Sequence, residues 1–305
     1  MLQLSEFTKL KPNPSFKIWG GRRLSHLRQV ALTGTDPLGE TWEVSIHPDG
    51  TCTTFHGHKL SDYLNSEQLP YLVKFIDTSD NLSIQVHPAD EYARIHENQS
   101  GKTECWLILD AAPGAGLYLG LKKGVTRDQF QKAIEASAQV DELMNFYPLK
   151  KGQFFFVPAG SLHAIGKDVL MCEVQQSSGV TYRVWDWNRL DDKGQSRELH
   201  VKKAMDVAQF EASKNELSYF RYQENLFQMK GQLKLVDHAD FEMSLWNADS
   251  KESLSLMAKK RALSVICLEG EFQIGNVILK AYESGISLKN EEILSLKAGR
   301  CLIVQ

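Results

Sequence analysis

The chain has 305 residues and a formal net charge of -3, from 35 basic and 38 acidic residues. This near balance excludes a broad basic field, so we expect no binding to nucleic acid and none to anionic membranes. At roughly 100–200 residues per domain, the length predicts one large domain or two medium ones.

The cysteines are odd in number, widely spaced and without a Cys-x-x-Cys pair; they are Cys52, Cys105, Cys172, Cys267 and Cys301. This pattern argues against a disulfide framework and against a thiolate zinc site, and it favours a reducing compartment. The first residues lack a basic and then apolar leader, and no apolar run approaches the roughly 20 residues that cross a bilayer. We therefore expect a cytoplasmic protein.

Short apolar or alternating runs, separated by Gly, Pro, Asn and Asp, recur along the chain. Such runs favour a mainly β jelly roll or sandwich over parallel βαβ units. Strands are expected at 72–76, 82–86, 106–109, 154–157, 169–174, 233–236, 262–268, 272–279 and 301–304, with a turn at 269–272.

Helices are expected as short additions to this β framework. Apolar residues at helical spacing predict a helix over 126–144, and Thr126 with Gln129 forms a capping-box pattern at its start. A second short helix is expected over 88–95 and a third over 199–210.

Four residues have the chemistry of a metal site. Gln85 and His87 lie two apart in a strand-like run and therefore point to the same face, and Glu104 and His163 follow later in the chain. A lone Gln-x-His is more often a polar lining than a ligand pair. Two imidazoles, a carboxylate and an amide oxygen can nevertheless hold one divalent cation and leave room for substrate or water.

The stretch that ends at His163 is the most specific motif. Gly152, Pro158, Gly160 and His163 have the spacing of the second signature motif of cupins, in which a tight turn returns the histidine to the lumen of a jelly-roll barrel. The alternative is a hairpin with an incidental histidine. The resemblance predicts a cupin barrel with short helical additions.

A polar, mixed stretch at 214–222 predicts a domain boundary. Residues 1–219 are expected to form the metal-binding cupin domain, with a helical addition near 122–146. Residues 220–305 are expected to form a smaller jelly-roll-like domain without metal ligands.

Three further residues are candidates for catalysis. Lys102 lies two residues before Glu104 and shares its face, and Glu173 and Arg183 follow the cupin motif. Arg183 could bind a phosphate or a developing enediolate, or it could stack among the neighbouring aromatic residues, and the sequence favours neither. The pair His56-x-His58 is interpreted as an exposed hairpin or strand end.

The combination of segments resembles the type I phosphomannose isomerases, in their shorter bacterial form. The segments that carry the resemblance are 18–21, 39–45, 70–76, 82–88, 101–106, 158–165 and 182–189. Ser178-Gly179-Val180 stands where the longer forms have Ser-Asp-Asn, and the chain is too short for their large helical domain.

The resemblance implies an enzyme with one Zn²⁺ per chain that interconverts mannose 6-phosphate and fructose 6-phosphate, a small phosphosugar substrate. It implies that His87, Glu104 and His163 are zinc ligands, that Arg183 is the active-site arginine, and that Gln85 matches the glutamine that is a ligand in longer members.

An enediol mechanism needs a base to move a proton between C1 and C2, and Lys102 and Glu173 both remain candidates. Two other functions stay open. The same ligands resemble the facial triad of non-haem iron oxygenases, and a cupin could also bind metal without turnover, as a sugar sensor.

Overall fold

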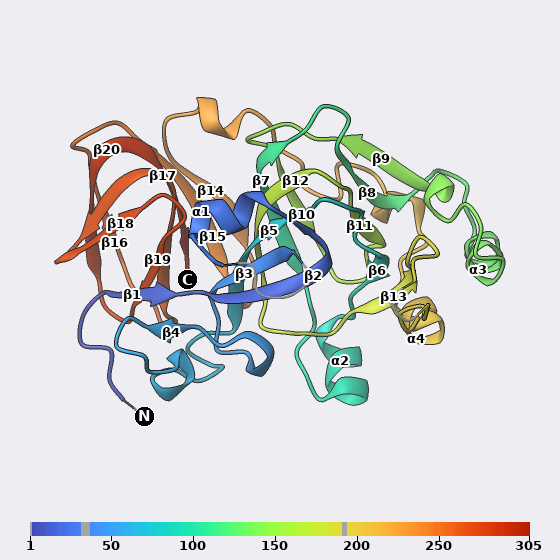
Figure 1. Cartoon of the computed structure of the whole chain (residues 1–305), viewed down its shortest axis with the longest axis horizontal. Helices are drawn as coiled ribbons and strands as arrows, with labels where there is room; N and C mark the ends of the chain where they lie inside the picture. The colour runs from blue at the N-terminus through green and yellow to red at the C-terminus, as the bar shows by residue number, and fades with distance from the viewer. Residues whose placement is uncertain (1, 32–36, 191–193) are drawn as a thin grey trace.

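The structure is a computed structural model that describes residues 2–31, 37–190 and 194–305. In this described part the strands form three antiparallel sheets, which lie side by side as layers (Figure 1). Helices are few and short. The prediction of a mainly β fold is confirmed.

A six-stranded sheet is the middle layer. Because alternate residues of a strand point to opposite faces, Tyr71, Val73 and Phe75 pack toward the C-terminal strands, while Lys74 and Ile76 face the other way. The strand order is β10 (Phe154–Val157), β7 (Glu104–Ala111), β12 (Val169–Gln176), β5 (Tyr71–Asp77), β3 (Leu38–Val44) and β2 (Asn13–Gly21).

A five-stranded sheet covers one face of the middle layer. Apolar residues of the two sheets, among them Trp106, Ile108, Leu119 and Ile165, form a shared core. The strand order is β13 (Tyr182–Trp185), β6 (Ile84–Val86), β11 (His163–Ile165), β8 (Gly116–Leu121) and β9 (Met144–Pro148).

A nine-stranded sheet, mostly from the C-terminal third, covers the other face. Its two N-terminal members are β1 (Thr8–Lys11) and β4 (Thr53–Thr54), and β1 pairs with β19. The predicted domain boundary at residue 219 stays a prediction. β1 and β4 precede this position in the chain but belong to the same sheet as the strands that follow it. The remaining strands are β14 (Gly231–Asp237), β15 (Glu242–Ala248), β16 (Ser253–Leu256), β17 (Leu263–Ile274), β18 (Val277–Lys280), β19 (Ser284–Ser287) and β20 (Glu291–Val304).

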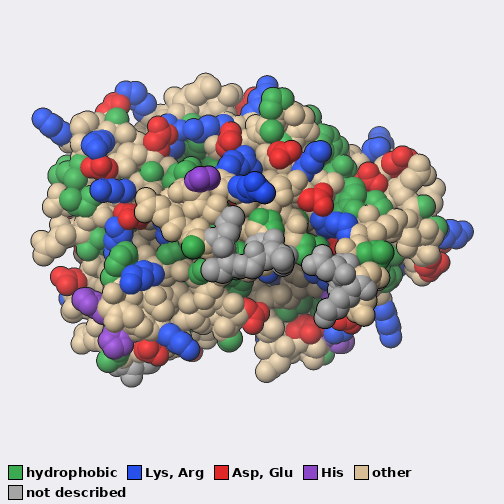
Figure 2. Space-filling view, in the orientation of Figure 1, with side chains coloured by type: hydrophobic (Ala, Val, Ile, Leu, Met, Phe, Trp, Pro, Cys, Tyr) green, Lys and Arg blue, Asp and Glu red, His purple; other side chains and the backbone are tan. Residues whose placement is uncertain are grey.

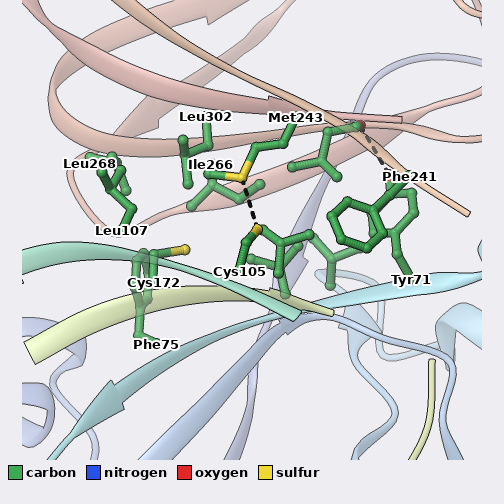
Figure 3. Close-up of a cluster of buried hydrophobic side chains, with 14 of the residues drawn as sticks. Tyr71, Phe75, Cys105, Leu107, Cys172, Phe241, Met243, Ile266, Leu268 and Leu302 are labelled. Atoms are coloured by element: carbon green, nitrogen blue, oxygen red, sulfur yellow. Dashed lines mark hydrogen bonds between the residues drawn. The ribbon is translucent and has the colours of Figure 1, made fainter. Parts of the chain in front are cut away.

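The contact between the middle layer and the C-terminal strands is an apolar core (Figure 3). Phe75 and Leu107 from the middle sheet meet Met243 and Leu302 from the other side, and all four side chains are buried. All five cysteines lie among the described residues, where they are buried and free.

The helices are shorter than the sequence pattern predicts. The capping box of Thr126 and Gln129 is confirmed, but the predicted helix over 126–144 is wrong beyond Glu135, because Ser137 and Gln139 adopt left-handed backbone angles and the chain enters β9 at Met144. The helix predicted over 199–210 is confirmed only for its central residues. The helices are α1 (Arg23–Arg28), α2 (Asp90–Glu97), α3 (Arg127–Glu135) and α4 (Val201–Val207).

The turn predicted at 269–272 is wrong. Strand β17 continues through it to Ile274, and its pairing with β20 shifts register on both sides of Glu269. Gly270 has a φ of 88°, and a Cβ there would lie 2.8 Å from the Ala298 carbonyl oxygen. The glycine therefore permits a bulge within one bent strand rather than a turn between two strands.

The surface carries charges of both signs. On the face drawn in Figure 2, basic and acidic side chains are interspersed rather than segregated. Among the described residues, no helix is both long and apolar enough to span a membrane.

Candidate metal centre and pocket

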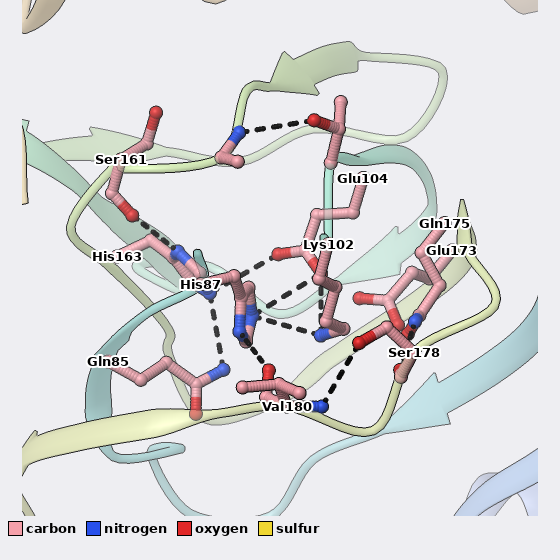
Figure 4. Close-up of polar contacts among 12 residues, drawn as sticks. Gln85, His87, Lys102, Glu104, Ser161, His163, Glu173, Gln175, Ser178 and Val180 are labelled. Atoms are coloured by element: carbon pink, nitrogen blue, oxygen red, sulfur yellow. Dashed lines mark hydrogen bonds and ion pairs between the residues drawn. The ribbon is translucent and has the colours of Figure 1, made fainter. Parts of the chain in front are cut away.

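The predicted metal residues come from two facing sheets. Gln85 lies on β6, His87 follows that strand, and His163 begins β11 in register with Gln85, all in the five-stranded sheet. Glu104 begins β7 of the six-stranded sheet. The structure thus brings the four residues together between the two layers (Figure 4).

His87, Glu104 and His163 form a tight, buried group. Each offers one ligand atom, and these three atoms lie within 4.8 Å of one another. The Glu104 carboxylate oxygens lie 3.5 Å from Nε2 of His87 and 3.3 Å from Nε2 of His163. All three residues are at most 2% exposed.

Backbone carbonyls fix the orientation of both imidazoles. Nδ1 of His87 lies 2.9 Å from the Val180 carbonyl oxygen, and Nδ1 of His163 lies 3.0 Å from that of Ser161. If each Nδ1 donates its proton there, Nε2 keeps a lone pair directed at the group. Burial, aided by Lys102, lowers the pKa of His163 to about 4 and that of His87 well below its usual value. Both rings are therefore neutral at pH 7, the form that binds metals.

The surroundings of the Glu104 carboxylate show whether a cation would fit between the three side chains. Among the described residues neither oxygen accepts a well-aligned hydrogen bond, although both are buried. Lys102 Nζ lies 2.8 Å from Glu104 and 2.9 Å from His87 Nε2. A buried carboxylate that accepts no well-aligned hydrogen bond, beside two imidazole nitrogens, fits a divalent metal that accepts nitrogen and oxygen ligands.

Gln85 reaches the group through its amide. Its Nε2 is 3.2 Å from Nε2 of His163, while its Oε1 accepts a 3.3 Å hydrogen bond from Ser83. The amide oxygen therefore faces away from the group. A 180° rotation of the amide, which exchanges oxygen and nitrogen, would make Gln85 a possible ligand.

Glu173 lies in the pocket beside the group, on β12. Trp106 Nε1 donates a 2.9 Å hydrogen bond to it, and Lys74 Nζ lies 3.8 Å away. Burial, together with the nearby Glu104, raises the pKa of Glu173.

Sequence reasoning missed Lys74 and Glu40, which face the same pocket. Lys74 Nζ lies 4.2 Å from the Trp42 ring centroid and 4.0 Å from the Glu40 carboxylate. Burial raises the pKa of Glu40, but Lys74 and Lys17 outweigh it and the net pKa is lowered. The available signal was a lysine within the apolar strand run Tyr71-Leu-Val-Lys-Phe-Ile, since a charge there is rarely buried without a role.

Arg183 lies on β13 and lines this pocket, whose volume is about 150 Å³. Its Nε donates to Ser83 Oγ at 3.2 Å, and its Nη1 donates to the Glu198 carbonyl at 3.0 Å. Both acceptors are neutral. Burial and the neighbouring Arg197 lower the pKa of Arg183. Two of the aromatic residues on which Arg183 could alternatively have stacked, Trp185 and Trp187, pack against each other with ring centroids 4.7 Å apart.

The remaining histidine pair lies away from this pocket. His56 and His58 flank the turn at Gly57 and are exposed, as expected for a hairpin.

Comparison with known proteins agrees with this arrangement. Residues 7–105 match the family model of the type I phosphomannose isomerase catalytic domain. Mannose-6-phosphate isomerase ManA of Bacillus subtilis is 35% identical over 277 residues, which are 86% of this chain and 85% of that protein. The chain belongs to the type I mannose-6-phosphate isomerase family.

A second relative and two solved structures are also similar to this chain. Mannose-6-phosphate isomerase of Streptococcus mutans is 33% identical over 273 residues, 85% of this chain and 84% of that protein. The crystal structure of the B. subtilis mannose 6-phosphate isomerase superposes with a TM-score of 0.80 at 25% identity, over 99% of this chain and all of that one. A zinc-bound mannose 6-phosphate isomerase, 16% identical with a TM-score of 0.72 over 98% of this chain and 99% of that one, shares the fold.

Proposed function

We propose that the chain interconverts D-mannose 6-phosphate and D-fructose 6-phosphate. Relatives at 33–35% identity carry the name of this isomerase. The observation that carries the proposal is the buried His87–Glu104–His163 group, which adjoins a pocket that also contains Glu173 and Arg183. A metal, a buried carboxylate and a guanidinium are together able to carry out an aldose–ketose isomerisation.

Zinc is the proposed metal, one ion per chain. His87, Glu104 and His163 would hold it, and Gln85 would join them after rotation of its amide. When bound, zinc supplies a Lewis acid that polarises the oxygens on C1 and C2 of the open-chain sugar.

Glu173 is the proposed base that moves the proton between C1 and C2 in an enediol mechanism. Lys102 is the less suitable candidate, because its ammonium is ion-paired with Glu104. Burial lowers the pKa of Lys102, but Glu104 and Glu173 outweigh it and the net pKa is raised, so the lysine stays protonated. The pKa of Glu173 is raised toward the working pH, which suits a general base.

Arg183 is proposed to bind negative charge. Its hydrogen-bond acceptors are neutral, so its positive charge is available to the enediolate or the 6-phosphate. Lys17 and Arg197 line the same pocket and are further cations that could bind the phosphate.

A coupled assay of purified protein with mannose 6-phosphate, with and without a chelator, tests this proposal. We expect conversion that chelation abolishes and zinc restores. Arg183→Ala should keep zinc and lower kcat/KM by roughly 10²–10³-fold, as for other donors that stabilise a transition-state charge. The matched control is Arg300→Ala, because Arg300 pairs with Glu269 in the C-terminal sheet, outside the pocket.

The same preparation separates the other two functions. Oxygen consumption with bound iron, and no sugar conversion, would indicate an oxygenase. Stoichiometric metal binding without turnover would indicate a sensor. Full activity after chelation or in Arg183→Ala would sink the proposed mechanism.

A further inference from the structure

Residues 101–104, named here the site segment, carry both Lys102 and Glu104. Thr103, in its centre, is held from both sides by Gln176 at the end of β12. The Thr103 N–H donates to Gln176 Oε1 at 2.8 Å, and the Gln176 N–H donates to the Thr103 carbonyl at 3.0 Å. The position of Gln176 therefore helps to set the position of Glu104.

Two carboxylates fix the side-chain amide of Gln176. Its Nε2 donates to Asp240 Oδ2 at 2.6 Å and to Asp90 Oδ1 at 3.2 Å, and Gln176 is 2% exposed. An amide has donors on nitrogen and an acceptor on oxygen. With carboxylates on the nitrogen side, a flipped amide would set its oxygen against negative charge, so the observed orientation toward Thr103 is enforced.

Asp240 reaches Gln176 across the layers. It lies in the turn between β14 and β15, where its own N–H donates to His238 Nδ1 at 3.1 Å. The His238 N–H donates to the Phe241 carbonyl at 3.0 Å, and the Phe241 side chain is fully buried in the apolar core. The turn is thus anchored and presents the Asp240 carboxylate in a fixed place.

The direction of Gln176 follows from strand alternation. Glu173 points into the pocket, whereas Val174 lies in the core shared with the C-terminal strands. The side chain of Gln176, two residues beyond Val174, points to the same face and meets Asp240 there. A contact on the face remote from the pocket can therefore act on the metal site through the strand end.

We propose that Asp240 is a positioning residue for the metal site: through Gln176 it holds the site segment so that Glu104 and Lys102 keep their places. The inference deepens the proposed function and rests on Glu104 as a metal ligand. The C-terminal part of the chain supplies no ligand of this group, but through Asp240 it would affect zinc binding.

Asp240→Ala removes an acceptor from a buried amide, and we expect the zinc dissociation constant, measured by competition with a chromogenic chelator, to rise about tenfold. At saturating zinc, kcat should fall several-fold while KM changes by less than about twofold, because Asp240 is not among the residues that line the pocket. Asp240→Asn retains an oxygen that can accept the bond and should recover most of the loss.

Asp237→Ala is the matched control in the same hairpin. Asp237 is exposed and pairs with Lys234, so its loss should leave zinc affinity and kcat unchanged. In a Gln176→Ala background, Asp240→Ala should have little further effect, because the link is already broken.

Zinc affinity of Asp240→Ala within twofold of the parent would overturn the proposal. An equal loss in Asp240→Asn, or a full additional loss in the Gln176→Ala background, would also overturn it. The zinc readout needs no substrate. A parent protein that binds zinc but does not isomerise the sugar therefore refutes the proposed function while this test still decides the role of Asp240.

Discussion

The two faces of the six-stranded sheet are both buried, yet they differ in chemistry. On the side of the C-terminal strands, Val73, Phe75 and Leu107 pack in an apolar core. On the side of the five-stranded sheet, neighbouring positions of the same strands carry Lys74 and Glu173. The apolar and the charged residues are therefore direct neighbours in the sequence, as Val73 and Lys74 are.

Because of this difference, the two faces contribute differently to stability and to activity. Burying a charge costs free energy unless partners compensate it, whereas burying apolar area stabilises the fold by about 25 cal/mol per Å². The pocket face therefore carries charges that stability alone would not select. Apart from the contact between Gln176 and Asp240, we expect substitutions on the core face to change stability and those on the pocket face to change activity.

Phe75→Ala should give the largest change in stability. The side chain is fully buried in the apolar core and packs edge-on against Tyr282, with ring centroids 5.3 Å apart. Its loss leaves a cavity, so chemical denaturation should show a decrease of about 3–5 kcal/mol in the free energy of unfolding. Activity per folded molecule at 25 °C should change by less than about twofold. Loss of activity in molecules that remain folded would break the division between the faces.

Glu173→Gln should give the next largest effect, on kcat. Glutamine keeps an oxygen that can accept the Trp106 hydrogen bond but cannot take a proton, so kcat should fall about 10²-fold or more, equivalent to about 2.7 kcal/mol in the barrier. The melting temperature should stay the same or rise, because a buried charge is removed. If kcat persists in this variant and is lost in Lys102→Met with zinc retained, the base is Lys102.

The sequence predicted much of this division but not all of it. Metal candidates were identifiable because the Gln-x-His pair and the cupin-like spacing before His163 are local patterns, and the structure brings them together. Lys74 and Glu40 were missed, since only the pairing of β3, β5 and β12 shows that they face one pocket.

The role of Asp240 was also beyond sequence reasoning. It depends on a contact between residues 64 positions apart, one at the end of β12 and the other in the turn between β14 and β15 of a different sheet. The helix over 126–144 failed for a different reason: left-handed angles at Ser137 and Gln139 end the helical path although the apolar spacing continues. Local periodicity does not report such backbone conformations.

Glu43 gives the smallest predicted effect and sharpens the comparison, because it is a carboxylate near the C-terminal strands. It is fully buried, lies 3.3 Å from the Arg28 guanidinium and accepts a 3.3 Å hydrogen bond from Ser284 on β19. Burial raises the pKa of Glu43 to about 7, although Arg28 opposes the shift.

The folded state therefore retains a proton that the unfolded state releases above its ordinary carboxyl pKa, near 4.5. Stability should fall as pH rises from about 4.5 to about 7 and stay lower above that range. Glu43→Gln mimics the protonated form at every pH, so relative to the parent protein it should gain about 2.5 kcal/mol of stability between pH 5 and pH 8. Urea titrations at both pH values measure this difference, in which other titrating groups cancel. If the stabilities of the two proteins changed with pH in parallel, Arg28 would keep Glu43 ionised. The core face would then also contain a buried ion pair, one whose attraction largely offsets the free-energy cost of burying its charges.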